Sequence, residues 1–187
     1  QSPPLKRHPP SRCPPPPPPP PRSPPRAAAW GAPGGVACVV GGTGMRAYDF
    51  KAGIGTASRR VPCGEQVFTV GALVQANFGR RPQLRIDGVP VGRVFTTWTP
   101  ERGKTKWMLA AIASDAPLIP SQLYRVCKRV GLGMARTGAI STHGSGDLVL
   151  AFANGQRMAR YGSANERAAM LSDRWLSTIY QGVVEAT

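Results

Sequence analysis

The sequence has few histidines, few cysteines and few acidic residues, and these shortages exclude several classes of site. Its 187 residues include two histidines, His8 and His143, and four cysteines that stand at least 25 residues apart. Because no Cys-x-x-Cys pair or cysteine–histidine cluster exists, we expect neither a metal site nor a cofactor held by such ligands. Reduced, mostly buried thiols are expected instead, which fits a cytoplasmic protein.

Long apolar runs are also missing. No stretch approaches the roughly 20 apolar residues that a membrane-spanning helix needs. The first 26 residues contain a single strongly apolar residue, Leu5, so no signal peptide is predicted. We therefore expect no membrane partner.

The shortage of acids leaves a net charge of +15, from 24 lysines and arginines against nine aspartates and glutamates. Such an excess first suggests a nucleic-acid-binding protein. The basic residues are scattered, however, as in Arg59-Arg60, Arg80-Arg81 and Lys128-Arg129. No stretch interleaves them with aromatic residues as a platform for single strands would. Specific nucleic-acid binding is not expected, and weak, salt-sensitive adhesion stays open.

Residues 1–30 form a proline-rich segment in which Pro14 to Pro21 are eight consecutive prolines. Such a run favours an extended polyproline II conformation and cannot build a core. We predict a disordered tail. The alternatives are a docking peptide for a proline-binding module and coding sequence read in a wrong frame. Residues 31–187 are predicted to form one domain.

Short apolar runs bounded by turn residues predict strands. The predicted strands are 35–40, 67–79, 84–92 with a turn at Asp87-Gly88, 107–113 and 147–154. A helix is predicted from Ser121 to Gly131, with Leu123, Val126, Cys127 and Val130 on one side. A second helix is predicted after Ser163-x-x-Glu166, which has the form of a capping box, with Leu171, Trp175, Ile179 and Val183 on one side. This mixture without regular alternation predicts an α+β fold with stacked layers.

One glycine motif is rejected. Gly42, Gly44 and Ala47 match a G-x-G-x-x-A dinucleotide fingerprint after a predicted strand. The fingerprint requires a helix next, but residues 48–60 have no amphipathic helical period.

Three polar side chains are candidates for catalysis. Ser145 and Asp147 are two residues apart in an extended segment, so both side chains can point into one site. The alternative is a turn in which Asp147 accepts backbone hydrogen bonds. Asn77 ends the strongest strand, where its amide could stabilise an oxyanion or simply terminate the strand. No histidine-assisted nucleophile can be assembled, so an α-amino group is the candidate base.

Six segments together resemble the L-aminopeptidase/D-esterase family, which includes DmpA-like aminopeptidases and β-peptidyl aminopeptidases. The segments are GGTGMRAYDFKAGIGTASR (41–59), TVGALVQANFG (69–79), IDGVPVG (86–92), ASDAPLIPSQL (113–123), GLGMARTG (131–138) and GSGDLVLAF (144–152). The resemblance implies a four-layer αββα sandwich of the N-terminal-nucleophile type, incomplete here at its N-terminus because the family has over a hundred further residues before residue 41.

The resemblance also implies an activity. Family precursors cut themselves before a serine, whose freed hydroxyl then attacks short peptides, amides or esters while its own amino group acts as the base. No cofactor is needed, and a homo-oligomer is expected. Carried over by position, Asn77 corresponds to the oxyanion-hole asparagine, and Ser145 and Asp147 to residues that orient the nucleophile and its amine. Tyr48 corresponds to an active-site aromatic.

The nucleophile position is where this sequence departs from the family. An ungapped alignment back from Asp115 puts Trp107 there, and the nearest hydroxyl belongs to Thr105, two residues earlier and shortly after Gly103. Thr105 is therefore the predicted nucleophile of a self-processed aminopeptidase. Two alternatives remain from the residues: an inactive member kept as an assembly partner, with Trp107 filling the old site, and a basic protein that adheres to nucleic acid.

Overall fold

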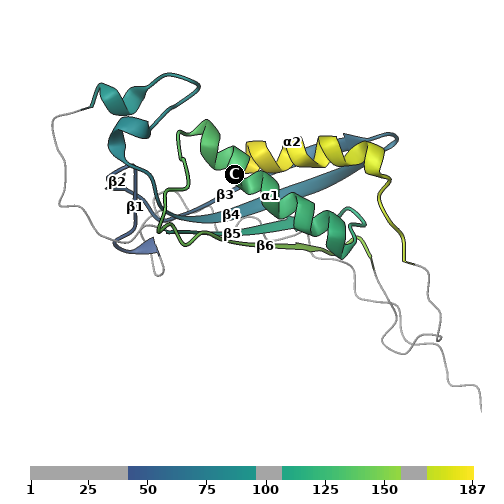
Figure 1. Cartoon of the computed structure of the whole chain (residues 1–187). Coiled ribbons are helices and arrows are strands. Elements are labelled where there is room, and N and C mark those ends of the chain that lie inside the picture. Colours follow the sequence, from purple (N-terminus) through teal and green to yellow (C-terminus); the bar gives the residue numbers. More distant parts are fainter. Residues whose placement is uncertain (1–41, 96–106, 157–167) are drawn as a thin grey trace, which may run out of the picture.

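A four-stranded sheet is the central element of the computed structural model, which describes residues 42–95, 107–156 and 168–187. Its strand order is β3-β4-β5-β6 (Figure 1). The strands are β3 Ile54–Cys63, β4 Gln66–Asn77, β5 Trp107–Ser114 and β6 Leu148–Ala153. Neighbours pair antiparallel from β3 to β5, whereas β6 runs parallel to β5 after the connection through α1.

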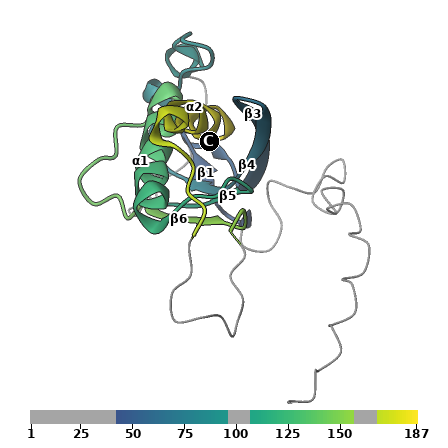
Figure 2. The ribbon, with the colours of Figure 1, turned by 90° about the vertical axis from the view of Figure 1, so that its right-hand side faces the viewer.

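Two helices, α1 Pro120–Arg136 and α2 Leu176–Ala186, lie on the same face of this sheet (Figure 2). The core lies between them and alternate strand residues, as the two-residue period of strands requires. Val70, Ile112, Val130, Ile179 and Val183 are at most 1% exposed. The α+β prediction is confirmed.

The opposite face of the sheet is open in the described part of the chain. Leu148, Leu150 and Phe152 on β6 point to that side and are each more than half exposed. The described residues thus supply one helical layer and one sheet, which are two of the four layers of an αββα sandwich.

A small lobe adjoins the end of the sheet where β4 stops. It contains the two-stranded hairpin of β1 Arg46–Ala47 and β2 Phe50–Lys51, and the 3₁₀ turns η3 Arg81–Gln83 and η4 Val91–Arg93 (Figure 1). The predicted turn at Asp87-Gly88 is confirmed, since both residues have positive φ and Ile86 bridges Val89. The predicted strand over 84–92 is wrong, because this single bridge and η4 take its place.

The predicted strands 67–79, 107–113 and 147–154 are confirmed as β4, β5 and β6. The prediction for 35–40 falls outside the described residues. β3 is not predicted from the sequence, because only Val61 and Cys63 of its ten residues are buried and its remaining side chains are mostly polar or small. Its presence shows why residues 48–60 lack a helical period and supports rejection of the dinucleotide fingerprint.

Helix α1 begins one residue before Ser121 and continues to Arg136, so the predicted end at Gly131 is wrong. The glycines have another role. A Cβ on Gly133 would lie 2.7 Å from the Thr187 Cβ, so glycine allows the end of α2 to approach α1 closely.

The second helix begins later than predicted. Residues 168–172 are not helical, Asp173–Trp175 form the 3₁₀ turn η5, and α2 starts only at Leu176. The capping box at Ser163 and Glu166 falls outside the described residues. Ile179 and Val183 are buried in α2 as predicted, whereas Leu171 reaches the core from the preceding segment, where its N–H donates to the Pro117 carbonyl at 2.8 Å.

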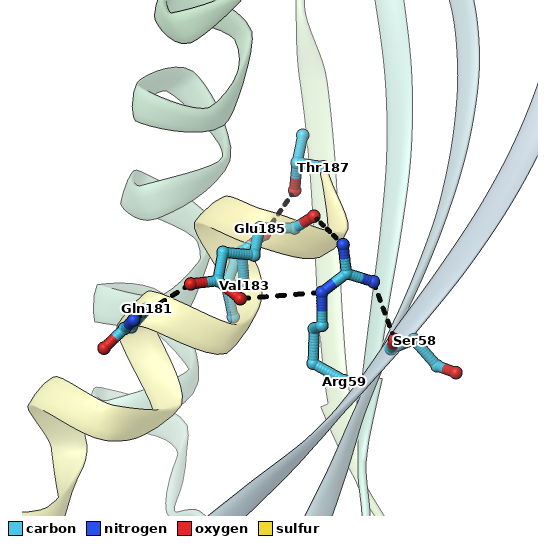
Figure 3. A network of polar contacts seen from close by, with 6 residues as sticks. All are labelled: Ser58, Arg59, Gln181, Val183, Glu185 and Thr187. Carbon is cyan, nitrogen blue, oxygen red and sulfur yellow. Dashed lines mark hydrogen bonds and ion pairs between the residues drawn. The ribbon is translucent and has the colours of Figure 1, made fainter. Parts of the chain in front are cut away.

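The C-terminal end of α2 is attached to β3 by one arginine (Figure 3). The Arg59 guanidinium donates to the Glu185 carbonyl at 2.9 Å and to the Ser58 carbonyl at 2.8 Å. Its Nε lies 3.5 Å from the Glu185 carboxylate, to which Gln181 also donates at 2.9 Å. These contacts attach the end of α2 to β3, one of the two edge strands of the sheet.

Gln122 is a buried polar residue that connects the N-terminal end of α1 to the segment just before α2. Its Oε1 accepts from the Ile119 N–H at 3.3 Å, and its Nε2 donates to the Leu171 carbonyl at 2.8 Å and the Asp173 carboxylate at 2.9 Å. Gln122→Leu would leave these groups without their partner. We expect the free energy of unfolding in urea to fall by about 1–3 kcal/mol.

The matched control is Gln66→Leu, which removes an exposed glutamine from the start of β4. It should change the free energy of unfolding by no more than about 0.5 kcal/mol. Equal losses in the two variants would contradict a structural role for the Gln122 hydrogen bonds.

Candidate active site

Three adjacent strands bring the candidate residues to one end of the sheet. Asn77, the last residue of β4, is the direct partner of Trp107, the first residue of β5. Leu109 pairs with Leu148 in β6, so Gly146 lies level with Trp107, and a Cβ on Gly146 would be 3.9 Å from the Trp107 Cβ. Residues from three distant stretches of sequence therefore meet here.

The amide of Asn77 has a fixed orientation. Its Oδ1 accepts a hydrogen bond from the backbone N–H of Arg46 in β1 at 3.2 Å. Because a backbone N–H pairs with the oxygen of an amide and not with its nitrogen, Nδ2 is the end that can donate. Asn77 thus presents a donor at the strand end, as an oxyanion site requires. No feature of the linear sequence indicates this contact, since Arg46 contributes only its backbone.

Ser145 and Asp147 contact each other directly. The Ser145 hydroxyl donates to the Asp147 carboxylate at 3.0 Å, and the Ser145 N–H closes a turn by donating to the Thr142 carbonyl at 2.9 Å. The loop therefore contains a turn, which was the alternative interpretation of these residues. The carboxylate, however, binds the neighbouring hydroxyl. A hydroxyl that is polarised by a carboxylate can accept from, and orient, a nearby ammonium group.

Thr105 falls outside the described residues. It precedes by two residues the start of β5, whose first residue is the half-buried Trp107. Directly opposite residues of an antiparallel pair share one face of the sheet. The indole of Trp107 therefore lies beside the amide of Asn77, on the open face.

Tyr48 contacts Phe78, the residue that follows Asn77 in the chain. Its backbone N–H donates to the Phe78 carbonyl at 2.9 Å, and its ring meets Phe78 edge-on at 5.4 Å between centroids. Its hydroxyl lies 2.5 Å from the Thr137 hydroxyl, which itself donates to the Met134 carbonyl, so Tyr48 is the donor. Burial raises the pKa of Tyr48. These contacts favour a structural role at the base of Asn77 over contact with substrate.

A buried arginine, which sequence analysis treated as one of the scattered charges, holds the same hairpin in place. The Arg81 backbone N–H donates to the Asp49 carboxylate at 3.0 Å, and its guanidinium donates to the Asp49 carbonyl at 3.1 Å and stacks on Phe50 at 4.3 Å. Tyr48 and Asp49 both have positive φ. Holding two consecutive non-glycine residues in this region costs free energy, which these contacts offset.

Neither cysteine of the described residues is suited to act as a nucleophile. Cys63 is buried and Cys127 half-buried, and both are free thiols. Burial raises the pKa of each thiol, which disfavours the reactive thiolate. The described residues also contain no group of three or more histidine, cysteine, aspartate or glutamate side chains that could hold a metal ion. Within the same ranges, no helix is long and apolar enough to span a bilayer.

The chain is similar to peptidases of known sequence and structure. The sequence profile of peptidase family S58 matches residues 23–187. The chain is 41% identical to the β-peptidyl aminopeptidase BapA of Sphingosinicella xenopeptidilytica over 180 residues, which cover 86% of this chain and 44% of the relative. It thus spans less than half the length of that relative.

Solved structures give the same result. The L-aminopeptidase D-Ala-esterase/amidase of Ochrobactrum anthropi, described as a variant of the Ntn hydrolase fold, superimposes with a TM-score of 0.70 at 42% identity. The match covers 78% of this chain and 40% of that one. A β-aminopeptidase of a Burkholderia species superimposes equally well, with a TM-score of 0.70 at 39% identity, 78% coverage of this chain and 42% of its own.

Proposed function

Because the chain belongs to peptidase family S58, we propose that it forms the catalytic part of an N-terminal-nucleophile aminopeptidase. The relatives named above are a β-peptidyl aminopeptidase and an L-aminopeptidase D-Ala-esterase/amidase. We therefore propose short peptides, amides or esters with a free N-terminal residue as substrates. No cofactor enters the mechanism, and further copies of the chain are its proposed partners.

One observation carries this proposal. Strand register supports it, because Asn77 ends β4 opposite Trp107 at the start of β5, and Gly146, which separates the hydrogen-bonded Ser145 and Asp147, lies level with Trp107. An amide donor for an oxyanion and a polar pair near an amine are the groups that this chemistry needs.

The proposed reaction starts with self-cleavage. The Thr105 hydroxyl attacks the carbonyl carbon of Lys104, so that an ester replaces the peptide bond and the α-amino group of Thr105 is released. Water then hydrolyses the ester. An α-amino group ordinarily has a pKa near 8, so the new amine can act as a base at neutral pH.

In each turnover the Thr105 hydroxyl attacks the substrate carbonyl, and its proton passes to the α-amino group of the same residue. Asn77 Nδ2 donates to the oxyanion, while Ser145 and Asp147 orient the ammonium group. The intermediate collapses, the leaving amine takes the proton, and water hydrolyses the resulting ester with the amine again as the base.

A second function rests on Trp107. Its indole lies beside Asn77, at the position where ungapped alignment with the family puts the nucleophile. An indole cannot attack a carbonyl, and its bulk would occupy space that a substrate needs. In this alternative the chain keeps the fold and serves as a non-catalytic assembly partner of active family members.

Mass spectrometry of the purified chain separates the two functions. Self-cleavage before Thr105 should yield two fragments, 1–104 and 105–187, whose masses add up to the uncut chain plus one water. A single uncut chain in a preparation that lacks hydrolase activity would support the assembly partner. An uncut chain in an active preparation would contradict the proposed base, because no α-amino group would be present at residue 105.

A further inference from the structure

The solvent side of α1 carries a row of cations without acidic neighbours on the helix. The helix contains no aspartate or glutamate, and its basic residues are Arg125, Lys128, Arg129 and Arg136. Residues three and four apart are neighbours on a helix surface, so Arg125, Lys128 and Arg129 form one cluster. We refer to these three residues as the α1 basic cluster.

Aromatic rings support each member of this cluster. The guanidinium groups of Arg129 and Arg125 lie 4.2 Å and 5.8 Å from the ring centroid of Tyr180, which comes from α2. The Lys128 ammonium lies 4.5 Å from the ring of Tyr124. Basic and aromatic side chains therefore alternate across two helices. Linear sequence does not show this pattern, because Tyr180 is more than 50 residues from its partners.

The cluster has little internal neutralisation. The ion pair that the structure shows for it joins Arg125 to Asp173 at 3.3 Å, with both side chains substantially exposed. Like charges three and four residues apart destabilise a helix. Such a cost is removed when an anionic partner binds, and the net charge of +15 would attract that partner over a distance.

We propose that the α1 basic cluster and Tyr124 bind the backbone and bases of single-stranded nucleic acid without sequence preference. Phosphates along one strand are spaced closely enough to contact all three cations. Tyr124 is 63% exposed, so its ring can also stack on a base. An acidic protein surface could form ion pairs with the cations, but the Tyr124 ring would add little to its affinity. This binding site is separate from the candidate active site and independent of the proposed function.

Fluorescence anisotropy with a labelled oligothymidylate of about 20 nucleotides tests the proposal. Arg125, Lys128 and Arg129 are each replaced by glutamine, which keeps much of the side-chain stem. We expect affinity to fall on the order of tenfold, and the slope of log affinity against log salt to decrease in magnitude by about 2, from three contacts of about 0.7 each. Tyr124→Ala should lower affinity about fivefold and leave the slope unchanged.

The control triple variant is Arg80→Gln, Arg85→Gln and Arg93→Gln, which removes the same charge from exposed positions in the adjoining lobe. It should change affinity by less than about threefold. Circular dichroism checks that every variant is folded. Equal losses in the two triple variants would overturn the proposal, because adhesion would then follow net charge alone. Competition by polyglutamate as strong as by unlabelled oligothymidylate would overturn it in favour of an acidic protein partner.

Discussion

Thr105→Ala should leave the chain uncut and reduce aminopeptidase activity by at least about 10⁴-fold. The substitution removes the only oxygen that the proposed mechanism can use for attack, and it acts twice. Without the hydroxyl, the bond before residue 105 stays intact, so the α-amino group that should serve as the base is never released. Loss of nucleophile and loss of base therefore appear together.

Two measurements follow these losses separately. Intact-mass analysis reports the cut, and release of p-nitroaniline from an aminoacyl p-nitroanilide reports turnover. Thr105→Ser keeps a hydroxyl on the same carbon and should retain both cutting and activity. Thr99→Ala, a change at another threonine of the same stretch, should leave both unaltered. Activity that survives Thr105→Ala would mean that Thr105 is not the nucleophile.

Strands with apolar residues on both faces could be predicted from the sequence, and β3, which lacks them, could not. β4, β5 and β6 consist mainly of aliphatic, alanine and aromatic residues, and all three were predicted. β3 buries only Val61 and Cys63 of its ten residues and depends on pairing with β4 along its length. Pairing leaves no pattern in the side chains of the strand itself, so β3 was missed.

Helix ends were predicted less well than helix faces, for a physical reason. The sequence shows the apolar stripe of α1 and predicts an end at Gly131, but packing against α2 keeps the helix intact through Gly133 to Arg136. A glycine is as suited to close helix contact as to helix termination, and only the position of the neighbouring helix decides between them.

In the candidate site, too, the sequence indicates the residue types but not their spatial arrangement. Residue types and motif resemblance predicted Asn77, Ser145 and Asp147, but their proximity follows from the pairing of β4 with β5 and of β5 with β6. The contacts that support Asn77 come from the hairpin at Arg46 to Lys51, whose backbone groups carry no sequence signal. Side-chain identity therefore predicts which groups are candidates, while strand register determines where those groups lie.

Asn77→Ala should lower kcat about 10²- to 10³-fold and change KM little, provided that the wild-type chain is active. A donor aimed at an oxyanion contributes most in the transition state, where the charge develops, and little in the bound substrate. Because the Arg46 N–H occupies Oδ1, Nδ2 is the donor that the alanine variant loses. Steady-state hydrolysis of the aminoacyl p-nitroanilide measures both constants.

Asn77→Asp distinguishes loss of the Nδ2 donor from loss of the hydrogen bond that Oδ1 accepts from the Arg46 N–H. One carboxylate oxygen can still accept from the Arg46 N–H, so the hairpin contact is kept, while the other places negative charge where the oxyanion forms. We expect this variant to be at least as slow as Asn77→Ala. Asn154→Ala, at an exposed asparagine just after β6, should leave kcat unchanged. If Asn77→Asp instead retains wild-type kcat, Asn77 acts only as the acceptor that anchors β1, and the oxyanion must be stabilised by another donor.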